Sequence, residues 1–219
     1  MGMMKEPKCI ELSKGATIFS EDYSLTNEIL KRNQKLVAIF GGSCIPEDSI
    51  YFQKAKGFAK LIASSGISII TGGGLGIMQA GNMGAKLSNS PVSSYGLRVE
   101  AIKDEIIKDN PYIDKDCEFT FNTLSVRLLT LIGSSDAIVL FPGGFGTLEE
   151  LFSLLVRLRV RMMKKVPVYL FGSEFWSGLI KWLSTEVLQN KVISEQDLQL
   201  FKIEDNIEKI STEIISLLK

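Results

Sequence analysis

The chain has 219 residues, in which 25 Lys and Arg balance 25 Asp and Glu, with three Cys and no His. The missing histidine excludes Ser-His-Asp and Cys-His nucleophiles, His-ligated zinc or haem iron, and imidazole proton shuttles. Any acid–base chemistry must therefore come from carboxylates, Lys, Tyr, Cys or water.

Size and charge narrow the class of protein further. A chain of this length, 45% apolar and 23% charged, is expected to fold as one globular domain. Its zero net charge argues against a nucleic-acid partner, which would normally be met with a basic excess. No apolar run reaches the roughly 18 to 20 residues of a membrane span, and the start has no signal-like apolar stretch. We therefore expect a cytoplasmic protein with no membrane partner.

The three cysteines form no recognisable ligand or disulfide pattern. Cys9, Cys44 and Cys117 are odd in number, far apart and without a CxxC pair. This spacing disfavours a zinc knuckle or a secreted disulfide framework, so we expect free thiols and no bound metal.

In chain order, residues 1–34 are mixed and polar, and we expect a peripheral arm with a short helix over 25–31. From residue 35 onward, short apolar runs, glycine turns and amphipathic stretches alternate. Continuous apolar runs are typical of strands buried on both faces of a parallel sheet. Their alternation with helices predicts a Rossmann-like, doubly wound α/β fold in a single domain over 35–219. The expected strands are 36–40, 67–70, 92–99, 137–141 and 166–171, and the expected helices are 47–65, 77–87, 123–133, 148–163, 174–189 and 207–218.

Three of these strands end directly in glycine-rich turns, at 41–43, 72–76 and 142–147. Glycine lets backbone N–H groups approach a ligand, and the N-terminus of the following helix carries partial positive charge. The carboxyl ends of parallel strands meet at one edge of the sheet, where doubly wound folds bind ligands. One such turn is also explained by simple strand-to-helix geometry, but three at one edge predict a nucleotide or sugar-phosphate site.

Dinucleotide and ATP sites are the alternatives. GxGxxG does not follow the first strand, and the later Gly74-Leu75-Gly76 run reaches Gln79 where the third glycine belongs. Glu100, near the end of the third expected strand, could mimic a ribose-binding acid, so an NAD site stays open as an alternative. The Gly-Lys-Ser/Thr ending of a P-loop is absent, which argues against an ATPase.

The third glycine turn leads into two adjacent carboxylates. Thr147 lies three residues before Glu150, the spacing of a capping box, which gives Glu150 a structural role. Glu149 has no such role, and the helix dipole should keep it ionised. Helix-end electrostatics alone explain Glu149, but an anion beside a phosphate-binding loop also suits ribose chemistry with an oxocarbenium-like centre.

Arg127 lies at the border of the apolar stripe of helix 123–133. It either extends to solvent along its aliphatic stem or directs its guanidinium at phosphate, ribose or Glu149. Further along, a basic group within 157–165 lies beside apolar residues of the same helix. That pattern is typical of the rim of a packed or dimer-forming helix.

Together these residues resemble the Lonely Guy family, the cytokinin-activating phosphoribohydrolases, earlier labelled lysine decarboxylase-like. Residues 142–150, PGGFGTLEE, fit the family signature PGGxGTxxE throughout. Residues 71–78, TGGGLGIM, are similar to its second motif, and 42–46 to its opening turn. Residues 110–112 and 170–176 are similar to the longer bacterial branch related to nucleotide 5'-monophosphate nucleosidases. The resemblance extends over about residues 36 to 205.

The resemblance implies hydrolysis of the N-glycosidic bond of a nucleoside 5'-monophosphate, AMP-like or a cytokinin riboside monophosphate, to free base and ribose 5-phosphate. It places the family's arginine on Arg127 and its essential glutamate on Glu149. It implies no cofactor, and no metal is required because helix termini and Arg127 can neutralise the phosphate. The expected partners are the nucleotide and a second copy of the chain, in a homodimer or a higher oligomer. The expected substrate and phosphate contacts are Gly42, Ser43, Gly73, Gly74, Gly76, Met78, Pro142, Gly143, Gly144, Phe145, Gly146, Thr147 and Glu150, with Glu100 as a further candidate.

Three positions depart from the family pattern. Leu128 stands where Lys follows the arginine, Gln79 where Glu follows Gly-Ile-Met, and Leu75 where the glycine loop has Pro. These departures keep open a second function, that of a non-catalytic nucleotide or cofactor carrier of the same fold. A pyridoxal phosphate decarboxylase is disfavoured, because no Lys lies at the three glycine turns to form a Schiff base. The family's acidic substrate contact near the third strand aligns with Glu100, Asp104 or Glu105.

Overall fold

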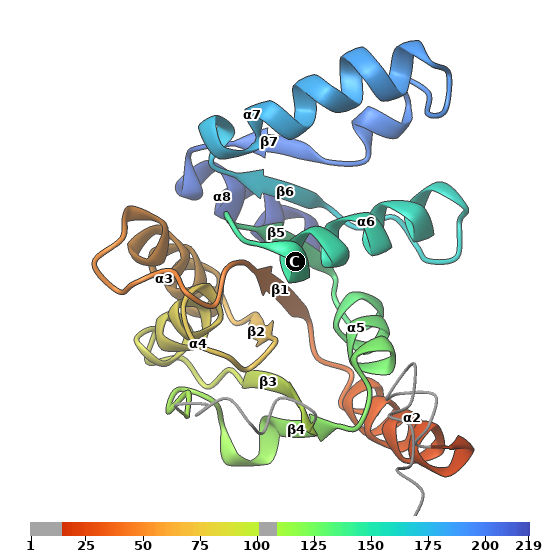
Figure 1. The fold of residues 1–219 in the computed structure, drawn as a ribbon. Coiled ribbons are helices and arrows are strands. Elements are labelled where there is room, and N and C mark those ends of the chain that lie inside the picture. The colour runs from red at the N-terminus through yellow and green to blue at the C-terminus, as the bar shows by residue number, and fades with distance from the viewer. Residues whose placement is uncertain (1–14, 101–108) are drawn as a thin grey trace, which may run out of the picture.

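The computed structural model describes residues 15–100 and 109–219. Within these residues the sheet has seven strands, all parallel, in the order β4-β3-β2-β1-β5-β6-β7 (Figure 1). This confirms the predicted Rossmann-like α/β fold with a doubly wound parallel sheet in a single domain. The strands are β1 Leu36–Phe40, β2 Ser68–Thr71, β3 Ser94–Val99, β4 Glu118–Phe121, β5 Ala137–Leu140, β6 Val168–Phe171 and β7 Lys202–Glu204.

Helices cover both faces of the sheet (Figure 1). Successive strand residues point to opposite faces, so each layer of helices packs against its own half of the strand side chains. One layer consists of α2 Ala16–Lys31, α5 Leu124–Gly133, α6 Phe145–Arg159 and α7 Ser173–Trp182, and the other of α3 Ile50–Ser64, α4 Ile77–Lys86 and α8 Ile207–Leu218. Short 3-10 turns at Lys115–Cys117 and Asp197–Gln199 and a π-helix at Leu183–Val187 join these elements.

The predicted strands are the five inner ones, and both edge strands were missed. The inner strands are buried on both faces and therefore appear in the sequence as continuous apolar runs. β4 instead alternates exposed and buried residues, and β7 is three mostly exposed residues long. Edge strands of this kind carry no continuous apolar signal.

Some helix bounds also differ from the prediction. The expected helix over 174–189 ends as α-helix at Trp182 and continues as the π-helix. The expected short helix over 25–31 is the end of the longer α2, whose Asp22 and Ile29 are 0% and 2% exposed. α2 is therefore packed onto the domain, while the division of the chain at residue 35 stays a prediction.

The position of β1 in the middle of the strand order indicates where a ligand site is expected. β2, β3 and β4 lie on one side of β1, and β5, β6 and β7 lie on the other. The carboxyl ends of β1 and β5 are therefore the topological switch point, where doubly wound sheets bind ligands. In the part of the chain that the structure describes, no helix is long and apolar enough to cross a bilayer.

Candidate active site

The three glycine turns lie together at the carboxyl ends of β1, β2 and β5. The amide of Gly42 donates to the carbonyl of Pro142 at 2.9 Å, and the amide of Ile77 donates to the carbonyl of Gly42 at 3.1 Å. The first turn is thus bonded to the third turn and to the residue that directly follows the second turn. Gly76, with a φ of 61°, is required here because a Cβ would lie 2.3 Å from the Gly42 carbonyl oxygen.

The third turn starts α6 three residues earlier than the predicted residue 148. Gly144 is the N-cap residue and Phe145 the first helical residue, so Thr147 lies inside the first turn. The predicted capping box between Thr147 and Glu150 is therefore wrong. Thr147 is instead buried beneath the turn, where a Cβ on Gly143 would lie 2.1 Å from its hydroxyl oxygen. This close approach requires glycine at 143 and leaves Glu150 without a capping role.

Two helices direct uncapped N-termini toward this edge. α4 follows Gly76 and α6 follows Gly144, and no side chain in the described ranges caps either of them. By contrast, the Thr123 side chain caps α5. First-turn N–H groups and the helix dipole together bind anions such as phosphate. Exposed residues at or next to these two N-termini include Ser43, Gly144, Phe145 and Gly146.

Arg127 is directed inward, beneath the same edge, and is only partly exposed. Its Nε donates to the carbonyl of Leu97 in β3, and its Nη2 donates to the carbonyl of Gly72 at 2.9 Å. Burial lowers the pKa of Arg127, whereas the charges of Glu150 and Glu149 raise it. The guanidinium is thus fixed beside the second glycine turn, close enough to both carboxylates for their charges to interact.

The two adjacent carboxylates have different surroundings. Glu149 is exposed, whereas Glu150 is partly buried. Burial raises the pKa of Glu150 to about 7, because the Arg127 charge only partly offsets desolvation and the Glu149 charge adds to the rise. A carboxyl group that titrates near neutral pH can donate and accept a proton, and such groups are concentrated at functional sites.

Sequence reasoning selected Glu149, but the burial and the charges favour its neighbour. The signature itself contained the signal, because its last Glu falls on Glu150 when PGGxGTxxE is counted along residues 142–150. We missed this match because the apparent capping box gave Glu150 a structural role. A chemical role for Glu149 stays a prediction.

A buried polar network behind the second glycine turn was not predicted. The Asn82 Oδ1 atom accepts from Thr71 Oγ1 at 2.7 Å and from Asn110 Nδ2 at 3.0 Å. Asn110 Nδ2 also donates to the carbonyl of Gly74 at 3.0 Å, and the amide of Gly73 donates to Thr71 Oγ1 at 3.0 Å. Buried polar groups that satisfy one another in this way fix the shape of the turn that they support.

Comparison with known proteins decides the family. A profile described as "Possible lysine decarboxylase" matches residues 71–214, well over half of the chain. The chain belongs to this family, the Lonely Guy family.

Relatives and solved structures agree with this membership. The chain is 25% identical over 194 residues to the "Bifunctional cytokinin biosynthesis protein" of Fusarium pseudograminearum, which covers 80% of the chain but only 39% of that relative. It is 25% identical over 175 residues to the "Cytokinin riboside 5'-monophosphate phosphoribohydrolase" of Rhodococcoides fascians, covering 75% of the chain and 86% of the relative. The molybdenum cofactor carrier protein of Chlamydomonas reinhardtii has a similar structure, with a TM-score of 0.61 and 19% identity over 85% of the chain and 99% of that protein. At that identity the structural match shows the fold alone.

The three residues that depart from the Lonely Guy pattern have different surroundings in the structure. Leu128 is 8% exposed and packs in the apolar core, so this position supplies no cation to the edge. Gln79 Nε2 donates to the Glu47 carboxylate at 2.9 Å, which ties the start of α4 to the segment that follows the first turn. Leu75 is partly buried within the second turn.

Other predicted Lonely Guy contacts are placed as follows. Met78 lies against the second turn, because a Cβ on Gly72 or Gly74 would meet its thioether group at 2.8 or 2.6 Å. Glu100 directly follows β3 and is partly buried at the carboxyl edge. The other two acidic candidates, Asp104 and Glu105, lie outside the described residues.

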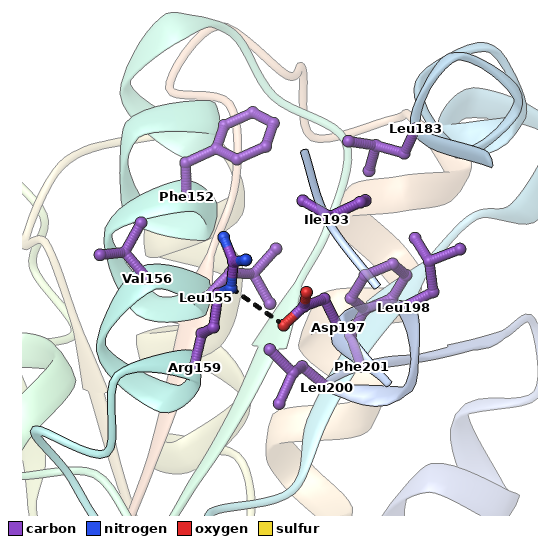
Figure 2. Close-up of a pocket in the computed structure, with 10 residues that line it drawn as sticks. All are labelled: Phe152, Leu155, Val156, Arg159, Leu183, Ile193, Asp197, Leu198, Leu200 and Phe201. Atoms are coloured by element: carbon purple, nitrogen blue, oxygen red, sulfur yellow. Dashed lines mark ion pairs between the residues drawn. The ribbon is translucent and has the colours of Figure 1, made fainter. Parts of the chain in front are cut away.

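Two features lie apart from the glycine edge. No group of three His, Cys, Asp or Glu in residues 15–100 and 109–219 is placed to hold a metal ion, and Cys44 and Cys117 are free thiols, while Cys9 lies outside that part. An apolar groove lies between α6 and the segment that follows α7 (Figure 2). Its lining is Phe152, Leu155, Val156, Arg159, Leu183, Ile193, Asp197, Leu198, Leu200 and Phe201, with Arg159 and Asp197 paired at 3.3 Å.

Proposed function

We propose that the protein is a phosphoribohydrolase that cleaves the N-glycosidic bond of a nucleoside 5'-monophosphate, AMP-like or a cytokinin riboside monophosphate. The observation that carries this proposal is the carboxyl group of Glu150, titrating near neutral pH close to the inward-directed Arg127 at the edge where three glycine turns meet. The name of the Rhodococcoides relative supports the same reaction class. Residues 110–112 and 170–176 favour the longer bacterial branch of the family. We place the reaction in the cytoplasm and expect no cofactor.

The N-terminus of α6 is the proposed phosphate site. Its first-turn N–H groups follow Gly144 without a side-chain cap among the described residues, and they lie at the switch point of the sheet. The uncapped start of α4 borders it through the bond from Ile77 to Gly42. The proposed contacts are Gly42, Ser43, Gly73, Gly74, Gly76, Met78, Pro142, Gly143, Gly144, Phe145, Gly146 and Thr147, with Glu100 toward the base.

Glu150 is the proposed acid and base. The C1'–N bond breaks with its electron pair going to the base, which takes a proton from Glu150. The resulting carboxylate stabilises the ribosyl cation and then accepts a proton from the water that adds to C1', which restores the acid and yields ribose 5-phosphate. A carboxyl group with a raised pKa thereby performs the work that histidine, absent from this chain, often performs.

Arg127 is the proposed substrate anchor. Its guanidinium is held by the carbonyls of Leu97 and Gly72 and needs no rearrangement when an anionic substrate arrives. Its charge also limits the rise in the pKa of Glu150, which keeps that group near neutrality.

Base release tests the proposal. Purified protein is incubated with AMP, GMP, CMP and isopentenyl-adenosine monophosphate, and free base is measured by chromatography. We expect base from at least one of them, and a fall in kcat/KM of about 100-fold or more in Arg127→Ala, whose circular dichroism should be unchanged. The absence of base from all four substrates would contradict the proposal.

A carrier of the same fold is the second candidate. The buried Leu128 supplies no cation and Gln79 is neutral, so the edge lacks two charges usual in the family. Calorimetry with the same nucleotides distinguishes the two functions, because a carrier binds without releasing base.

We also propose a homodimer through the outer face of α6. Phe145, Phe152, Val156 and Val160 are 92%, 38%, 56% and 54% exposed and follow at intervals of seven, four and four residues, which places them on one side of the helix. An exposed apolar stripe of this length marks an interaction surface, and a second copy can cover it around a two-fold axis. The stripe begins in the third glycine turn, so the partner would border the site.

A further inference from the structure

The most deeply buried charged side chain described in α2 is that of Asp22, which is 0% exposed. α2 precedes the part of the chain matched by the family profile, which begins at residue 71. Among the described residues, the carboxylate accepts four hydrogen bonds, all from the two residues that directly precede α5. Asn122 donates from its amide N at 2.7 Å and its Nδ2 at 3.2 Å, and Thr123 donates from its amide N at 2.9 Å and its Oγ1 at 2.7 Å.

These bonds continue into the first turn of α5. Thr123 is the N-cap residue, and its Oγ1 accepts from the amide of Val126 at 3.3 Å while donating to Asp22. The carbonyl of Thr123 accepts from the amide of Arg127 at 3.3 Å. A buried carboxylate with this many donors holds them firmly, because losing one would leave a buried polar group unpaired. The backbone of Arg127 is therefore two hydrogen bonds away from Asp22.

A second contact lies on the other side of Arg127. The Oγ1 atoms of Thr26 and Thr130 are 2.6 Å apart, so one hydroxyl donates to the other. The accepting hydroxyl donates in turn to a carbonyl of its own helix, that of Asp22 for Thr26 or that of Val126 for Thr130. α2 thus holds α5 both before and after Arg127. The guanidinium at the far end of that side chain donates to two backbone carbonyls that lie outside α5, so its geometry depends on where α5 lies.

We propose that Asp22 is a positioning residue for Arg127, and that α2 is in this way part of the framework of the active site. The relevance for turnover rests on the phosphoribohydrolase function proposed above, but the positioning itself does not. Shifts on the order of 1 Å in a catalytic group can cost about 100-fold in rate. Asp22→Asn replaces one acceptor oxygen by an amide donor that would face the donors of Asn122 or Thr123.

The first measurement needs no substrate. In protein labelled with 15N-arginine, the Nε–H resonance of Arg127, assigned by its loss in Arg127→Lys, reports the bond to the Leu97 carbonyl. We expect Asp22→Asn to shift or broaden it. The control is Ile29→Ala, which removes a side chain of the same helix that is 2% exposed and should leave the resonance in place. An unmoved resonance in Asp22→Asn, or an equal movement in Ile29→Ala, would overturn the proposal even if the protein releases no base.

The second measurement is a double-mutant cycle on base release. We expect Asp22→Asn to lower kcat/KM about tenfold in the wild-type background and less than about twofold in Arg127→Lys, since the effect passes through the arginine. Equal losses in both backgrounds would show a merely structural role. If Asp22→Asn does not fold, Thr123→Val takes its place, and Thr123→Ser, which keeps the hydroxyl, should behave as the wild type in both measurements. Failure of the proposed function removes only this second measurement, and the resonance then decides alone.

Discussion

The two faces of α6 differ in the burial and the type of their side chains. The inner face buries Thr147, Leu151 and Leu154 and brings the partly buried Glu150 toward Arg127, while the outer face exposes Glu149 and an apolar stripe. Adjacent helical residues differ by about 100° in direction, so two neighbouring carboxylates have quite different surroundings. We therefore expect chemistry from the inner face of this helix and association from the outer one.

The largest expected effect separates the two glutamates. We expect Glu150→Gln to lower kcat/KM for nucleoside monophosphate hydrolysis by about 100-fold or more, because Gln can neither donate nor accept the proton that the reaction needs. Glu149→Gln, the matched control one residue away, should change it by less than about fivefold, because an exposed charge acts through water. Steady-state base release in both variants measures the difference, and the reverse order would return the role to Glu149.

The next effect concerns the outer face. Val156→Arg places a charge in the middle of the apolar stripe, opposite its own copy if α6 packs around a two-fold axis. We expect the variant to be a monomer at concentrations where the wild type is a dimer, as measured by size-exclusion chromatography with light scattering. Lys191→Ala, at an exposed position outside the stripe, serves as a control and should stay dimeric. A monomeric wild type would refute this assignment of the outer face.

A third effect is the pH dependence of stability. Burial raises the pKa of Glu150 to about 7 from its ordinary value of 4.5, so the folded protein binds this proton more tightly than the unfolded chain does. The stabilisation is complete below pH 4.5 and is lost as the pH rises through about 7, a change of up to ~3 kcal/mol. Thermal melts of Glu150→Gln between pH 5 and 8 should lack this component of the wild-type decline. An identical pH dependence in both proteins would show that the carboxyl group titrates normally.

The inner strands and the three glycine turns could be predicted because their signals are local. A strand buried on both faces must be apolar throughout, as β1 is, and a turn that crowds another backbone must carry glycine, as Gly76 and Gly143 do. The edge strands β4 and β7 lack the first signal, so sequence reasoning missed them. The predicted start of α6 was also wrong, because the spacing of Thr147 and Glu150 resembles a capping box although the helix begins at Phe145.

Composition and glycine spacing are properties of the chain alone, so they were enough to predict the fold class, to reveal the family signature and to exclude histidine chemistry. The folded structure was needed to show that Arg127 is directed inward, that Glu150 is more buried than Glu149 and closer to that arginine's charge, and that Asp22 lies at the start of α5. The physical reason is that desolvation and charge interaction depend on which distant segments meet. Residues 22 and 123 lie 101 positions apart, and no local pattern records their contact.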